Sequence, residues 1–171
     1  MPADLTPVIA ACTRWLLAAY PPSPGALNYA LAEAQARQAA TLAAHLRHPT
    51  ALDVQLLHLL GPGGTGRLDW LTAADLGDDD GMAWRTWVDE TVVSWAACLL
   101  ADPALSGLAR QALERTEHRD EASGLRRLTV PGPRDSEAAA LLRHPDLLEG
   151  IAGLHRDTLL ALLDADSAAL P

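Results

Sequence analysis

The sequence of 171 residues contains no lysine and no phenylalanine, and it has only two cysteines. All 13 of its basic residues are therefore arginines, and the 22 aspartates and glutamates leave a net charge of −9. Because an acidic chain repels phosphate backbones, this charge argues against general nucleic-acid binding. The two cysteines, Cys12 and Cys98, lie far apart in apolar surroundings, so we predict buried, reduced thiols rather than a disulfide framework.

Targeting signals and long apolar runs are also missing. The first residues, Met1 to Asp4, lack a basic segment, and the apolar run from Trp15 to Tyr20 is far too short to span a membrane. The sequence therefore predicts a cytoplasmic protein that does not enter a membrane.

Segments of alternating β-branched residues are absent, and valine and isoleucine are scarce. Apolar residues recur at helical spacing instead, between clusters of proline and glycine that end one helix and precede the next. We therefore predict an all-α protein, a single compact bundle of about eight helices. Its single domain, 1–171, is expected to contain an extra N-terminal helix in 1–22, a first half in 26–101 and a second half in 102–165.

A leucine-rich helix is predicted between Thr50 and the glycine-rich segment Gly61–Gly64. Thr50 is expected to cap this helix, and Asp53 favours its amino end. The leucines are predicted to form its buried side, at positions Leu52, Leu56, Leu57, Leu59 and Leu60. Another helix is expected from Asp146 to Leu163, with Leu147, Ile151, Leu154 and Leu159 facing inward.

The stretch from Met82 to Ala101 is the most apolar of the chain, and we predict that it forms one central helix. Trp95 is expected to lie deepest, because no charged residue follows it before Leu100. Asp89 and Glu90 are expected on the exposed side of this helix. Asp89 lies four residues after Arg85, so the two are expected to form an ordinary ion pair on the helix surface.

Two tryptophans in the first turns of that helix lie next to a run of acids in the sequence. A tryptophan ringed by acids is suited to receive a basic or apolar segment of another protein. The predicted partner-binding residues are Trp84, Trp87, Asp78, Asp79 and Asp80.

An internal repeat is indicated at an offset of about 70 residues. In the first half, a long helix is expected after the stretches Leu59–Gly63 and Leu71–Leu76. In the second half, a long helix is expected after the corresponding stretches Leu128–Gly132 and Leu141–Leu147. Each half is expected to contain a helix, a Gly/Pro loop, a short helix, a tight turn and a long helix.

The segment His48–Leu60 resembles part of the amino-terminal domains of Clp-type AAA+ unfoldases, and so does the later turn Leu76–Asp79. Those domains consist of two helical repeats. The resemblance covers 26–163. It departs from the family where Val54-Gln55 replace a glutamate–histidine pair and where Arg126-Arg127 replace leucines. The resemblance implies a module that docks protein substrates or adaptors, such as an accessory of a protein-quality-control machine.

The leading functional hypothesis is a non-enzymatic module that recognises a protein or peptide through an apolar groove with an acidic rim. One alternative is an acidic inhibitor or immunity-type partner of a basic protein, since a net charge of −9 would speed association.

The other alternative is a helical-bundle metalloprotein or enzyme that uses His45, His48 and His58, the first two of which can share a helix face. No carboxylate lies at a standard ligand spacing from these histidines, so we expect neither a bound metal nor a cofactor. The oligomeric state is left open.

Overall fold

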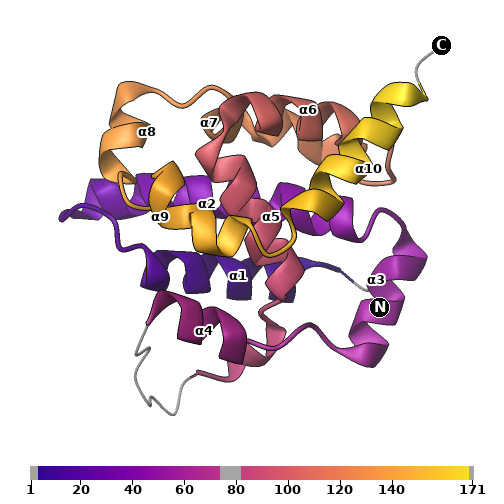
Figure 1. Ribbon diagram of the computed structural model, residues 1–171, viewed down its shortest axis with the longest axis horizontal. Coiled ribbons are helices and arrows are strands. Elements are labelled where there is room, and N and C mark those ends of the chain that lie inside the picture. The colour runs from indigo at the N-terminus through magenta and orange to yellow at the C-terminus, as the bar shows by residue number, and fades with distance from the viewer. Residues whose placement is uncertain (1–3, 74–81, 170–171) are drawn as a thin grey trace.

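The computed structural model describes residues 4–73 and 82–169, and within these ranges it contains helices and no strand (Figure 1). This confirms the predicted all-α bundle. Eight of the described helices have seven or more residues. The α-helices are α1 (Thr6–Ala19), α2 (Ala26–Arg47), α3 (Ala51–Leu60), α4 (Gly66–Thr72), α5 (Glu90–Ala101), α6 (Pro103–Leu113), α7 (Arg126–Thr129), α8 (Pro133–Ala138), α9 (Pro145–Ala152) and α10 (Arg156–Ala168). Two 3-10 helices, η1 (Met82–Trp87) and η2 (Arg119–Gly124), complete the set.

Helix α5 runs through the middle of the bundle (Figure 1). It packs mainly against α2 and α9, and also against α6 and α10, so every residue from Val92 to Leu100 is buried. Trp95 is buried more deeply than Trp84 and Trp87, as predicted, although several smaller residues of α5 are less exposed still. Its Nε1 donates hydrogen bonds to His155 O at 3.0 Å and Thr158 Oγ1 at 3.2 Å.

The predicted continuous helix from Met82 to Ala101 is wrong. η1 ends at Trp87 and α5 begins at Glu90, because Asp89 caps a new helix. Asp89 has an extended backbone, with φ −97° and ψ 118°, and its Oδ1 accepts hydrogen bonds from the first amides of α5. Its expected exposed pairing with Arg85 is wrong as well, since Asp89 is buried and the structure gives no ion pair between these two described residues, whereas Arg85 contacts Asp69.

Helix α2 can lie against both α1 and α5 because most of its buried residues are alanines. Alanine adds little beyond the helix backbone, so two helix axes can approach closely along an alanine stripe. The buried alanines of α2 are Ala32, Ala36, Ala39, Ala40, Ala43 and Ala44.

The helix expected from Asp146 to Leu163 is interrupted, and α9 ends at Ala152 before α10 begins at Arg156. The buried hydroxyl of Ser94 holds this break together. It donates to Ala152 O at 3.1 Å and accepts from His155 N at 2.9 Å, which satisfies two backbone groups that the break leaves free. Ile151 and Leu159 are buried as predicted, whereas Leu147 is 48% exposed.

Helix α3 lies at the edge of the bundle (Figure 1) and packs extensively on none of the other helices in the part of the chain that the structure describes. Thr50 and Asp53 form the expected capping box at its amino end. Val54 and Leu57 are the residues of α3 that point into the bundle.

The prediction that the leucines of α3 form its buried side is therefore correct only at Leu57. The other leucines lie on the opposite side of the helix and face solvent, because the bundle offers α3 contacts on a single narrow face. These exposed residues are Leu52, Leu56, Leu59 and Leu60.

Both cysteines are buried and free, as predicted. Burial raises the pKa of the Cys12 thiol to about 12, so it stays protonated and unreactive at neutral pH. Among the described residues, no helix has the length and apolar character required to cross a membrane.

Candidate functional site

The outer side of α3 gathers four exposed leucines on one short helix. Leu59 and Leu60 are each 79% exposed, Leu52 is 63% exposed and Leu56 is 45% exposed. Their spacing of four, seven and eight residues from Leu52 places them on one face of the helix. We call these four residues the leucine surface.

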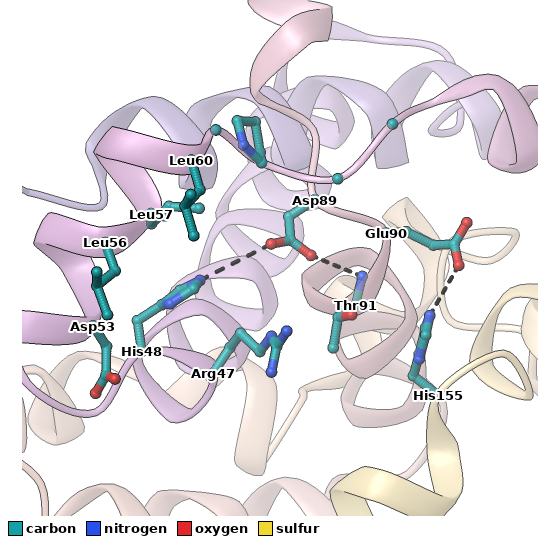
Figure 2. A pocket seen from close by; sticks show the side chains of 14 residues that line it. Arg47, His48, Asp53, Leu56, Leu57, Leu60, Asp89, Glu90, Thr91 and His155 are labelled. Atoms are coloured by element: carbon teal, nitrogen blue, oxygen red, sulfur yellow. Dashed lines mark hydrogen bonds and ion pairs between the residues drawn. The ribbon is translucent and has the colours of Figure 1, made fainter.

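A pocket of about 600 Å³ adjoins the leucine surface, and we call it the α3 pocket. Figure 2 shows Leu56, Leu57 and Leu60 on one side of it and Asp89 and Glu90 on the other. Leu56 and Leu60 belong to both the pocket and the leucine surface, so the two are continuous. The remaining lining residues are Arg47, His48, Asp53, Gly61, Pro62, Gly63, Gly64, Thr91 and His155.

Four separate segments build the α3 pocket. The end of α2 supplies Arg47, the start of α5 supplies Asp89 and Glu90, and the break between α9 and α10 supplies His155. The fourth segment is α3 with the loop that follows it. Gly61 ends α3 with φ +80°, a conformation that favours glycine.

The loop after α3 passes close to the first turn of α5. A Cβ atom on Gly63 would lie 3.3 Å from Glu90 N, so a side chain at this position would crowd the backbone of α5. Glycine at position 63 therefore lets the loop cross one edge of the pocket, which Figure 2 shows above Asp89.

Asp89 and His48 face each other in the pocket without a direct hydrogen bond. Asp89 Oδ1 accepts from Thr91 N at 2.8 Å and Val92 N at 3.2 Å, whereas Asp89 Oδ2 lies 3.9 Å from His48 Nε2. Burial lowers the pKa of His48, although the charge of Asp89 opposes this shift. His48 is therefore neutral at pH 7, and the negative charge of Asp89 is balanced mainly by the helix amides.

Glu90 forms the second acid–histidine pair of the pocket. Its Oε1 lies 2.9 Å from His155 Nε2 and 3.6 Å from the guanidinium of Arg67. The hydrogen bond with His155 ties the start of α5 to the start of α10 and fixes one side of the pocket.

The predicted partner-binding residues lie elsewhere or outside the described ranges. Trp84 and Trp87 are half-buried on η1 and pack against the core. Arg14 lies over the ring of Trp84 at 5.9 Å, and the ring of Trp87 lies 5.4 Å from that of His58 on α3. The predicted acids Asp78, Asp79 and Asp80 lie outside the described residues.

The three histidines proposed as metal ligands have different surroundings. His45 stacks on His118 with ring centroids 4.3 Å apart, His48 faces Asp89, and His58 Nε2 donates to Asp4 O at 2.8 Å. Within residues 4–73 and 82–169, no group of three or more His, Cys, Asp or Glu side chains is arranged to hold a metal ion.

Sequence reasoning missed Arg47, Glu90 and His155 as pocket residues. A usable signal was present at Asp89, because an aspartate followed by Glu-Thr-Val-Val is a typical helix start. No pattern in the sequence indicates that His155 reaches Glu90, because that contact depends on the break before α10.

Comparisons of the chain with protein-family models, with curated proteins and with solved structures found no significant match. The predicted internal repeat and the resemblance to Clp amino-terminal domains stay predictions.

Proposed function

We propose that the protein is a non-enzymatic helical module that binds a protein or peptide partner on the leucine surface of α3. The exposure of four leucines on one short helix carries this proposal. Apolar residues gathered on one solvent-facing helix side leave a surface whose burial by a partner is favourable, at about 25 cal/mol per Å².

The shape of the site supports a macromolecular partner. The leucine surface lies on α3 at the edge of the bundle (Figure 1), so a partner can reach it without displacing another of the described helices. The α3 pocket beside it offers a recess for a side chain of that partner. In one common mode of recognition, the apolar face of an amphipathic helix docks into a hydrophobic groove of its partner, and a helix such as α3 can be buried in this way.

Selection of peptides from a random phage-displayed library on the immobilised protein tests this proposal. We expect selected peptides to lose binding to a double variant, Leu59→Gln and Leu60→Gln, whose substitutions lie at exposed positions and leave the fold intact. Leu108→Gln on α6 is the matched control, since Leu108 is also exposed, at 51%. The absence of any peptide that depends on Leu59 and Leu60 would overturn the proposal.

A second copy of the chain is the competing occupant of the leucine surface. Sedimentation of the wild-type protein and of the double variant separates the two cases. A dimer that dissociates on substitution of Leu59 and Leu60 would assign the surface to self-association, whereas monomers in both samples favour a different protein.

An acidic inhibitor of a basic protein is the second candidate function, and the net charge of −9 favours it. A role as an adaptor in protein quality control rests on the resemblance to Clp amino-terminal domains alone. The hypothesis of a metalloprotein or enzyme that uses His45, His48 and His58 is tested by metal analysis of the purified protein.

A further inference from the structure

The α3 pocket combines an apolar wall with a negatively charged end. Leu56, Leu57 and Leu60 form the wall, and Asp89 and Glu90 lie beyond it (Figure 2). A long side chain with an apolar stem and a charged tip has the same distribution of properties. Among side chains, arginine and lysine have both a stem of this kind and a positive charge.

The charges of the lining residues favour a cation. Three carboxylates line the pocket, on Asp53, Asp89 and Glu90, and one arginine, Arg47, opposes them. His48 adds no positive charge at neutral pH, because burial lowers its pKa. Arg67 lies outside the lining and offsets part of the charge of Glu90. With the two lining histidines left out of the sum, the local balance is therefore negative by between about one and two charges.

Asp89 has acceptor capacity that its present contacts do not use. Oδ1 receives both capping amides, whereas the nearest cationic or potentially cationic group to Oδ2 is His48 Nε2, at 3.9 Å. That distance exceeds the length of a hydrogen bond. A guanidinium or ammonium group beside Oδ2 would supply a charge-assisted hydrogen bond, which is stronger than a neutral one.

We infer that the partner segment inserts an arginine or lysine side chain into the α3 pocket while its apolar residues cover the leucine surface. This inference rests on the proposed function and adds the chemistry of the partner: a basic, amphipathic segment. The continuity of the pocket with the leucine surface through Leu56 and Leu60 favours a side chain of the docked segment over a free amine. The net charge of −9 would also attract such a segment from solution.

The peptides selected from the library provide the first test. We expect those that depend on Leu59 and Leu60 to be enriched in arginine or lysine next to apolar residues. Peptides that depend on Leu59 and Leu60 but are neutral or acidic would overturn this inference and leave the proposed function standing. Failure to select any such peptide would overturn both.

Charge variants of the pocket provide the second test, by titration of one selected peptide. Glu90→Gln and Asp89→Asn keep a hydrogen-bond acceptor at each position, and we expect each to weaken binding about tenfold. Arg47→Gln removes the opposing positive charge, and we expect binding to strengthen about threefold. Asp146→Asn on α9 is the control for the loss of one negative charge outside the pocket, and it should leave the affinity unchanged.

The opposite changes in affinity expected for the acidic variants and for Arg47→Gln distinguish a cationic side chain in the pocket from an anionic one. Weaker binding by Arg47→Gln, with no loss for Glu90→Gln, would contradict the inference and assign the pocket to an acidic side chain. Competition with free arginine distinguishes a small amine from a side chain of the peptide. We expect micromolar free arginine to leave the peptide bound. Displacement of the peptide at that concentration would assign the pocket to a small ligand instead.

Discussion

Asp89 is the residue on which both the fold and the candidate site depend. Its Oδ1 accepts hydrogen bonds from the amides of Thr91 and Val92 in the first turn of α5, while its backbone turns the chain out of η1. The same carboxylate contributes negative charge to the α3 pocket. A single side chain therefore starts the central helix and sets the electrostatic character of the recess beside α3.

Substitution of Asp89 separates these two roles. Asp89→Ala removes the cap and should lower the free energy of unfolding by about 1 kcal/mol, within the range of about 0.5–2 kcal/mol for lost caps. Asp89→Asn keeps a capping oxygen and should lose only a few tenths of a kcal/mol. Chemical denaturation measures both values, and an equal loss in the two variants would show that capping is not the source of the effect.

His45 makes stability depend on pH. Burial, and secondarily the neighbouring His118, lowers the pKa of His45 from 6.5 to about 4. Between these values the unfolded chain binds a proton at His45 and the folded chain does not, so stability is complete above pH 6.5 and falls as the pH decreases towards 4. The full loss amounts to about 3 kcal/mol at most.

Thermal unfolding between pH 7 and pH 4 measures this dependence. We expect His45→Gln to unfold at a temperature that changes less with pH than that of the wild type. His144→Gln is the control, since His144 lies at the exposed start of α9. Parallel pH curves for wild type and His45→Gln would exclude this histidine as the cause.

At the scale of helices, the sequence predicted the start of α3 better than its buried face. The cap at Thr50 was predicted from a side chain that acts on its own backbone, and the structure confirms it. Such signals are local, so they need no knowledge of the rest of the fold.

The buried face of α3 could not be predicted in the same way. Leucines occupy more than one face of the helix, and the larger set, which includes Leu59 and Leu60, faces solvent. Which face is buried depends on the position of α3 relative to α2 and α5, and no local signal encodes that position. The α3 pocket was missed for the same reason, because it forms only where these elements meet.

Two leucines of α3 test its orientation. Leu57→Ala removes a buried side chain and should cost about 2–5 kcal/mol, depending on how far the surroundings close the cavity. Leu59→Ala should change stability by no more than about 0.5 kcal/mol, because its side chain is in solvent. Denaturation of both variants decides the orientation, and the reverse ranking would place Leu59 in the core.

At the scale of the whole molecule, one core cluster of buried residues extends from Leu5, just before α1, to Leu163 on α10. Trp95 lies within it and links α5 to the start of α10 through its indole hydrogen bonds. Removal of this side chain therefore affects contacts across the entire bundle.

Trp95→Ala should lower the free energy of unfolding by about 3–5 kcal/mol, in a single cooperative transition. Trp70→Ala is the matched control, because Trp70 is 80% exposed and its loss should cost little. Calorimetry of the two variants measures the difference. Similar melting temperatures for both would show that Trp95 does not anchor the bundle.

The position of α3 at the edge of the bundle also has a consequence for hydrogen exchange. Val54 and Leu57 are its buried residues, and the bond from Ala51 N to Glu117 Oε2 at 2.8 Å holds its first turn. A helix attached by so few contacts can open while the rest of the molecule stays folded. The amide protons of α3 are therefore expected to exchange with deuterium well before those of α5, so the helix that carries the leucine surface should change its shape at a lower cost in free energy than the central helix.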